Sequence, residues 1–415
     1  MKRTIYSLFF LLFAFSSLLA QEVDVDVLVV EEEETTPITL SGSVDTYFRY
    51  NITSPNRRSG DGAIVAPATS FANLPGFSLG MVNLIAGYEG ENVGFVGDLV
   101  FGPRGTEAVF EAGTASSTIV NQLYVYWNAS DAITLTLGNF NTFLGYEVIS
   151  PAGNFNYSTS YMFSYGPFSH TGLKADFALS DELSFMLAIM NPTDFTDFNP
   201  SASYSLGGQL GYSTDAASVY LNLLYGDQDG NFDSNKPFFG GESGAAFQAD
   251  ITAGFDLSDQ FYLGLNTTYK TTGVGDVVDE NGVDLEDAAG FGGAALYLQV
   301  SPSESFALGL RGEYFTEFGA GDSPNGVDFV PSPIGVGAIP VDISGDGNVL
   351  AFTLSGNVEI AEGLTLIPEF RLDAHSEDVA YPNRDFDFGD LDNVNNLGNS
   401  QSSLLSFLFA AVYSF

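Results

Sequence analysis

Residues 364–373 read LTLIPEFRLD, and this stretch decides the fold. Alternate side chains of an extended chain lie on opposite faces, so one face of the stretch is apolar and the other is polar or charged. The apolar face carries Leu364, Leu366, Phe370 and Leu372, and the opposite face carries Thr365, Glu369, Arg371 and Asp373. The same alternation recurs in 183–190, 261–266 and 306–314. It is typical of a membrane β-barrel, whose apolar face meets lipid while its charged face lines the interior.

Strand-like runs of this kind follow one another along the chain. They lie near 39–50, 78–89, 92–104, 118–129, 132–143, 170–180, 182–192, 204–214, 217–226, 244–257, 260–272, 290–301, 304–316, 349–361, 363–374 and 403–415. The connections between them alternate strictly between short and long. Bacterial outer-membrane barrels have short periplasmic turns, long outer loops and an even strand count. We therefore predict an all-β fold, a transmembrane antiparallel up-and-down barrel of about 16 strands with short periplasmic turns and long extracellular loops.

The basic residues and the last run agree with such a barrel. The basic residues within the runs lie on the face opposite the aliphatic one; they are Arg49, Lys174, Lys270, Arg311 and Arg371. An Arg or Lys facing lipid at the midplane would cost about 2–4 kcal/mol. The last run carries aromatic residues at alternate positions and ends at Phe415, which looks like the signal for the barrel assembly machinery. Because a free edge is unfavourable in lipid, this run must pair with 39–50.

The beginning of the chain resembles a secretory signal peptide. Lys2 and Arg3 form a basic start, 5–19 is apolar, and Ala20-Gln21 offers a cleavage point. We therefore expect 1–20 to be a signal peptide and the protein to reach the outer membrane of a Gram-negative bacterium.

The predicted barrel, 38–415, follows a short acidic segment. Residues 21–37 include the run Glu31-Glu32-Glu33-Glu34 and are expected to form a disordered periplasmic segment. A docking strand at Val25–Val30 is the alternative.

Composition excludes several kinds of function. The chain has 52 acidic and 12 basic residues and a formal net charge of −40, which argues against nucleic acid as a partner. Cysteine is absent, which excludes disulfides and thiol catalysis. The two histidines, His170 and His375, lack a catalytic arrangement, because Ser169 and His170 are adjacent and point to opposite faces of a strand. We expect neither enzyme activity nor a cofactor.

Residues 137–172, LGNFNTFLGYEVISPAGNFNYSTSYMFSYGPFSHTG, carry a family resemblance. The pieces that carry it are Gly138-Asn139-Phe140, Gly145-Tyr146-Glu147, Asn154, Tyr157-Ser158 and His170-Thr171-Gly172. With Met190-Asn191-Pro192 after the next run, the chain resembles the OmpL-like β-barrel porins of the outer membrane. Thr159 stands where the family leads us to expect a basic residue.

The resemblance implies an outer-membrane porin for passive diffusion of small hydrophilic solutes and names no solute. About 16 strands are enough to enclose a water-filled channel. The alternative is a non-conducting barrel with a structural or adhesive role through its long acidic loops. We expect outer-membrane lipid and lipopolysaccharide as partners, and analogy with sixteen-stranded general porins suggests a homotrimer.

Charged residues on the inward face are the expected pore lining. They are Asp45, Arg49, Asp98, Lys174, Asp176, Asp250, Lys270, Arg311, Glu313, Glu359, Glu369, Arg371 and Asp373. Acids outnumber bases among them, which predicts a preference for cations. If the charges pair across neighbouring strands instead, little selectivity results.

The long connection 144–169 is the candidate constriction. It has one charged residue and is dense in Tyr, Phe and Asn. Its candidate residues are Glu147, Asn154, Tyr157, Tyr161 and Tyr165. The loop either folds into the bore or packs its own aromatic residues at the outer rim.

A second long connection carries oxygen ligands at alternate positions. Asp227, Asp229, Asn231 and Asp233 lie in DQDGNFDSN, a spacing that can converge on Ca²⁺. The loop resembles the start of an EF-hand loop, but its glycine is at position four and no Glu stands at position twelve. Solvated turn residues are the alternative.

Overall fold

The computed structural model describes the barrel and part of its connections. The described residues are 38–56, 64–110, 113–199, 203–227, 245–272, 290–318, 339–341, 346–377, 381–382 and 400–415. The predicted signal peptide and the acidic segment 21–37 lie outside them and stay predictions. Everything below concerns the unit Ile38–Phe415.

The strands match the runs predicted from the alternation. Sixteen of them form the barrel: β1 (Ile38–Asn51), β2 (Gly76–Glu89), β3 (Val93–Phe101), β4 (Val120–Ser130), β5 (Ile133–Asn141), β6 (Ser169–Ala178), β7 (Leu183–Met190), β8 (Ser205–Ser213), β9 (Ala217–Asp227), β10 (Ala245–Asp256), β11 (Phe261–Thr272), β12 (Gly290–Ser303), β13 (Phe306–Phe318), β14 (Gly347–Ala361), β15 (Leu364–His375) and β18 (Ser403–Ser414). The largest difference is at β3, which ends before the predicted residue 104. Gly102 there has φ +98°, and Pro103, which has no N–H for the sheet, begins a short helix.

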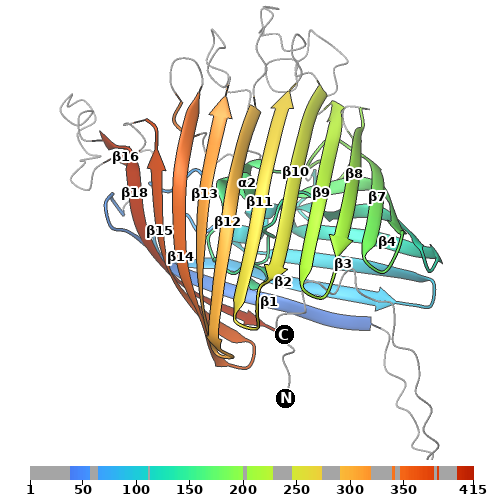
Figure 1. The fold of residues 1–415 in the computed structure, drawn as a ribbon, viewed down its shortest axis with the longest axis horizontal. Helices are drawn as coiled ribbons and strands as arrows, with labels where there is room; N and C mark the ends of the chain where they lie inside the picture. Colours follow the sequence, from blue (N-terminus) through green and yellow to red (C-terminus); the bar gives the residue numbers. More distant parts are fainter. Residues whose placement is uncertain are drawn as a thin grey trace, which may run out of the picture. The chain divides into compact units, whose positions relative to one another are not determined.

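These strands close into one antiparallel barrel. Each strand pairs with its neighbours in sequence, as Figure 1 shows for β7 to β15, and β18 pairs with β15 and β1. Gly42 and Phe415 exchange two backbone hydrogen bonds of 3.1 Å at this closure. The short strands β16 (Tyr381–Pro382) and β17 (Ser400–Gln401) form a separate two-stranded sheet. The predicted fold and the pairing of the first and last runs are confirmed.

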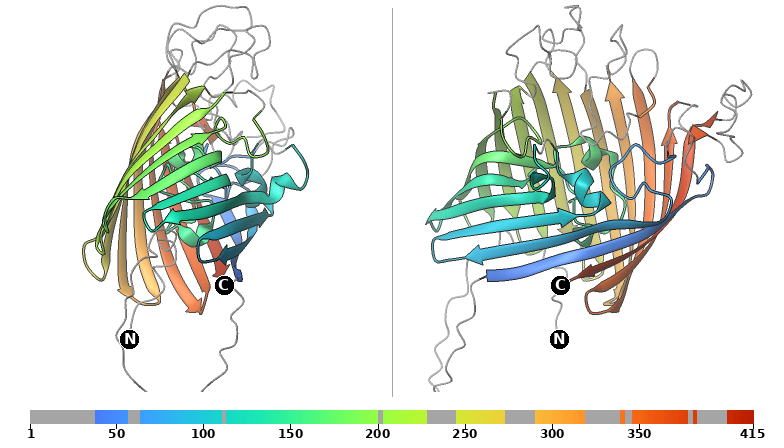
Figure 2. Two further views of the ribbon diagram at one scale, coloured as in Figure 1. Left: turned by 90° about the vertical axis from the view of Figure 1, so that its right-hand side faces the viewer. Right: turned by 180° about the vertical axis from the view of Figure 1, so that it is seen from behind.

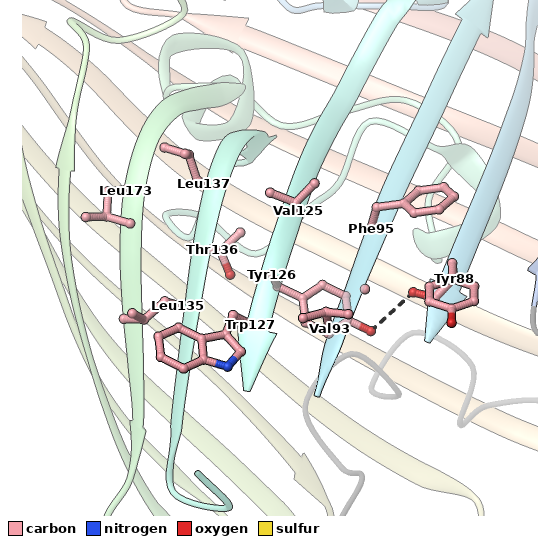
Figure 3. Close-up of a pocket in the computed structure, with 11 residues that line it drawn as sticks. Tyr88, Val93, Phe95, Val125, Tyr126, Trp127, Leu135, Thr136, Leu137 and Leu173 are labelled. Atoms are coloured by element: carbon pink, nitrogen blue, oxygen red, sulfur yellow. Dashed lines mark hydrogen bonds between the residues drawn. The ribbon is translucent and has the colours of Figure 1, made fainter. Parts of the chain in front are cut away.

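The two faces of the wall differ as predicted. On β13, Leu308 and Leu310 are 41% and 39% exposed, whereas Arg311 is wholly buried on the opposite face. The outward face over β2 to β6 forms an apolar groove, and Figure 3 shows Phe95, Val125 and the other side chains that line it. The aliphatic side chains of the wall therefore face outward, and the charged side chains face the interior of the barrel.

Short helices occur only in connections of the described chain. They are α1 (Pro103–Ala108), η1 (Ser117–Ile119), η2 (Pro151–Gly153) and α2 (Tyr161–Tyr165). None of the described helices is long and apolar enough to cross a membrane.

Candidate pore constriction

The connection between β5 and β6 folds into the barrel. It leaves the wall at Asn141 and returns at Ser169, its pairing partner in the sheet. Residues 156–170 are all buried, whereas 141–155 alternate between buried and partly exposed. The right-hand view of Figure 2 shows this green segment inside the ring of strands, where α2 contacts β12 and β13. We name residues 142–168 the inner loop.

Carboxylates of the wall accept paired backbone N–H groups of the inner loop. Glu313 of β13 accepts hydrogen bonds of 2.9 and 2.8 Å from the N–H groups of 161–162. Glu369 of β15 accepts bonds of 2.8 and 3.2 Å from those of 157–158. Both carboxylates are at most 2% exposed. Hydrogen bonds to a charged group contribute about 1.5–3 kcal/mol each, so these pairs fix the loop against the wall.

Two arginines of the wall bind the same part of the loop. Arg311 donates to the Ser158 carbonyl at 2.7 Å and forms an ion pair with Glu147 at 2.5 Å. Arg311 and Arg371 both donate to the Thr159 carbonyl, at 3.3 and 2.7 Å. All three charged side chains are buried. Thus the basic groups that meet Thr159 come from the wall.

The three candidate tyrosines are buried between the inner loop and the wall. The Tyr157 hydroxyl donates to Asp45 at 2.5 Å, and the Tyr161 hydroxyl donates to Asp373 at 2.9 Å. The Tyr165 hydroxyl accepts a bond of 3.0 Å from a backbone N–H of the β13–β14 connection. Burial raises the pKa of Tyr157 and Tyr161 well above the ordinary value, so these hydroxyls keep their protons and donate.

The other two candidates, Glu147 and Asn154, organise the loop itself. Besides its ion pair, Glu147 accepts a bond of 2.7 Å from Ser160 N. The Asn154 side chain accepts from Val148 N at 2.9 Å and donates to Val148 O at 2.6 Å. These bonds close a turn around η2, whose Ala152 is exposed.

Glycines on the inward face of the wall make room for loop aromatics. A Cβ on Gly309 of β13 would overlap the Phe155 ring, and one on Gly264 of β11 would overlap Tyr146. Tyr146 also stacks on Tyr297 with a centroid distance of 4.1 Å. The inner loop therefore reaches from its origin at β5 and β6 to the far wall.

The connection between β1 and β2 also packs inside, which the sequence-based prediction missed. Ser70 N donates to Ser164 Oγ at 2.8 Å, and Phe71 packs on Phe163 with ring centroids 5.8 Å apart. A signal was present, because 64–75 carries no charged residue, unlike a solvated outer loop.

Helix α1 adds a third contact to the inner loop. Its Arg104, which is 2% exposed, donates from Nε to the Ile149 carbonyl at 2.8 Å. The guanidinium lies over the Phe71 ring, 4.5 Å from the centroid, and 5.3 Å from that of Tyr157. The β1–β2 and β3–β4 connections therefore form part of the constriction together with the inner loop.

Asp194, in the connection after β7, holds the end of the inner loop. Its Oδ1 accepts bonds of 2.8 and 2.9 Å from Phe168 N and Ser169 N. It is 5% exposed, and burial raises the pKa of its carboxyl group to about 6.

The residues expected to line the pore fall into two groups. Nine are at most 4% exposed: Asp45, Arg49, Asp98, Asp250, Arg311, Glu313, Glu369, Arg371 and Asp373. Four are partly exposed: Lys174, Asp176, Lys270 and Glu359. Most of the first group contact the inner loop or its neighbours, while Asp98 accepts from the amides of Asn83, Asn121 and Gln122 on the wall.

The candidate Ca²⁺ loop cannot be placed. Asp229, Asn231 and Asp233 lie outside the described residues, and Ca²⁺ binding there stays a prediction. Within the described part of the chain, no group of three or more His, Asp or Glu side chains could hold a metal ion.

The sequence of 37–415 matches the model of the family described as Putative beta-barrel porin-2, OmpL-like. The chain belongs to this family. This match covers the whole barrel and agrees with the resemblance found in 137–172, and it identifies this OmpL-like porin as an outer-membrane barrel. No curated protein matches the sequence.

Solved outer-membrane proteins share the fold of this OmpL-like porin at low sequence identity. The channel DcaP of Acinetobacter baumannii is 13% identical, with 91% of this chain and 97% of that one covered and a TM-score of 0.53. The trimer form of OmpT of Vibrio cholerae is 10% identical, with 91% and 99% covered and a TM-score of 0.51. The anion-selective porin from Comamonas acidovorans has the same identity, coverage and TM-score as that trimer form. At these identities the likeness supports the fold alone.

Proposed function

We propose that the chain lets small hydrophilic solutes diffuse passively through a water-filled bore narrowed by the inner loop. The observation that carries the proposal is the inner loop, which buried charged side chains hold inside a closed barrel while part of 141–155, such as Ala152, stays exposed. A barrel of about 16 strands is wide enough to hold both a loop and an aqueous path. The clamp keeps the width of that path fixed.

We further propose that the pore prefers cations. The formal net charge of −40 favours cations in the surrounding field. Most of the inward-facing charged side chains are buried in contacts with the inner loop or its neighbours. The cation preference therefore depends on the charged groups that remain exposed to water. Glu359 of β14 is one of them, and within the described chain no basic side chain forms an ion pair with it.

A homotrimer in the outer membrane is part of the proposal. Strands β3 and β5 have nine residues each, whereas β14 has fifteen. Nine residues tilted by about 45° span roughly 21 Å, less than the apolar band of roughly 25 Å. Packing of further copies against the groove in Figure 3 would cover this short side. The trimer form of the outer membrane protein OmpT of Vibrio cholerae is in keeping with this.

Export through a signal peptide, assembly through Phe415 and contact with lipopolysaccharide complete the proposed setting. The mass of the detergent complex tests the assembly, with three chains expected and one chain contradicting the trimer.

Swelling of proteoliposomes tests the proposed function. Vesicles with the purified barrel should swell in isotonic small sugars and not in a large polysaccharide. Empty vesicles are the control. A folded barrel that causes no swelling would contradict the porin proposal and favour a structural or adhesive role.

A further inference from the structure

Four aromatic side chains cover glycines on the inward face of the wall from β8 to β13. They are Tyr220, Tyr262, Tyr146 and Phe155, and we name them the aromatic row. A Cβ on Gly211 of β8 would overlap the Tyr220 ring, and one on Gly254 of β10 would overlap Tyr262. The other two belong to the inner loop and cover glycines of β11 and β13. All four side chains are partly exposed, so each ring also borders open space inside the barrel.

The aromatic row lies toward the short turns, at the edge of the inner loop. Tyr220 is the fourth residue of β9 and Tyr262 the second of β11, and both strands begin at a short turn. Tyr146 of the inner loop donates from its hydroxyl to the Tyr262 hydroxyl at 2.8 Å. At about 4.8 Å per strand, the wall from β8 to β13 measures roughly 24 Å. The row is therefore longer than a single ion and borders the constriction.

Hydrogen-bonding side chains flank Tyr262 in the sheet. Asp256 of β10 and Gln299 of β12 lie directly opposite Tyr262, one on each side. Asp256 is exposed and Gln299 is partly exposed. Within the described part of the chain, neither side chain makes a hydrogen bond or an ion pair. Both can therefore bind a ligand that lies against the Tyr262 ring.

Other charged groups on these strands are covered or lie farther away. Asp250 of β10 is 2% exposed and accepts three hydrogen bonds from N–H groups. Arg311 of β13 is wholly buried beneath the inner loop. Lys270 lies eight residues from Tyr262, toward the opposite end of β11. The row therefore offers apolar ring surface, hydrogen-bonding groups and one exposed carboxylate, which suits a neutral, hydroxylated ligand.

We propose that the aromatic row binds neutral saccharides on their way through the pore. A sugar ring has an apolar face of C–H groups and a rim of hydroxyls. The apolar face stacks on an aromatic ring, because that contact removes apolar surface of both partners from water. Hydroxyls at the rim hydrogen-bond to the Gln299 amide and the Asp256 carboxylate. The inference rests on the proposed function and adds the class of solute.

Current blocks by saccharides in single-channel recordings test the row. Maltotriose, cellotriose and chitotriose are the probes, and at least one should interrupt the native current in resolved events whose rates give a binding constant. Tyr262→Leu and Tyr220→Leu each remove one ring and should lower that constant by at least about threefold. Tyr262→Phe keeps the ring and should stay closer to the native constant than Tyr262→Leu does.

Tyr126→Leu is the matched control. Tyr126 of β4 covers Gly94 of β3 as the row covers its own glycines, but it lies outside the row. Its loss should leave the binding constant native. The conductance of each variant in KCl without sugar shows that the barrel is folded and open.

The outcomes separate the saccharide site from the proposed function. A native barrel that conducts no current contradicts the porin proposal itself. A conducting native channel that none of the three sugars blocks overturns the saccharide site and leaves the porin proposal intact. Equal losses of binding in Tyr126→Leu and Tyr262→Leu also overturn it, because the rings then stabilise the wall alone. Block by added choline chloride but by no sugar would indicate a cation site and overturns it as well.

Discussion

Arg311→Met removes the centre of the clamp that holds the inner loop. The native guanidinium has four partners: the Glu147 carboxylate at 2.5 Å, the carbonyls of Ser158 and Thr159, and Thr353 Oγ1 at 3.0 Å. In the variant, Glu147 stays buried without its counter-charge. Loss of one partner of a buried ion pair costs about 3–5 kcal/mol, which is the expected fall in the free energy of unfolding.

The double variant Glu147→Gln with Arg311→Met separates the cost of the uncompensated charge from the cost of the lost packing. Because no uncompensated charge remains, it should recover about 2 kcal/mol relative to Arg311→Met. Urea unfolding of the barrel in lipid vesicles, followed by circular dichroism, measures both differences. An Arg311→Met barrel within about 0.5 kcal/mol of native would refute the reasoning. A double variant less stable than the single one would refute it as well.

Three further predictions concern packing, pH and the lipid face. Gly309→Ala should push Phe155 into the bore, reduce the conductance and lower the free energy of unfolding by about 1–3 kcal/mol. Gly312→Ala on the same strand is the control: its Cβ meets only an ordinary contact of 3.5 Å, so conductance and stability should both stay native. The pKa of Asp194 is about 6 in the folded state against an ordinary 3.8. Its stabilising contribution to the free energy of unfolding is therefore fully present below pH 3.8 and is lost as the pH rises through 6. Relative to Asp194→Asn, the native free energy of unfolding should therefore fall by up to about 3 kcal/mol between acid and neutral pH, and a constant difference would contradict this. Leu310→Arg on the outward face should cost about 2–4 kcal/mol in unfolding titrations in vesicles, and an unchanged midpoint would contradict a lipid-facing position.

The wall could be predicted from the sequence because lipid imposes a strict rule. Each strand must show apolar side chains on one face only, so the alternation in 364–373 gives both the strand and its orientation. The alternation of short and long connections then predicted that consecutive strands lie side by side and antiparallel. The bounds differ where local chemistry intervenes, as at Gly102-Pro103.

The constriction could be predicted only in part. The low charge of 144–169 pointed to the loop, and the structure shows it inside the barrel. Alternation shows which face a side chain occupies, but it does not show whether that face meets water or another segment. Tyr157 and Tyr161 therefore could not be assigned to a buried interface from sequence. Their partners, such as Glu369 and Asp373, lie more than two hundred residues away in the chain.

The most direct test of the account is whether the inner loop borders the conducting path. The native chain has no cysteine, so Ala152→Cys, at an exposed position of η2, gives a single reactive site. Leu310→Cys on the outward face is the control. During single-channel recording, a charged, membrane-impermeant thiol reagent should lower the current of the Ala152→Cys channel in a discrete step and leave the control unchanged. A labelled Ala152→Cys channel with native current would contradict a constriction formed by this loop.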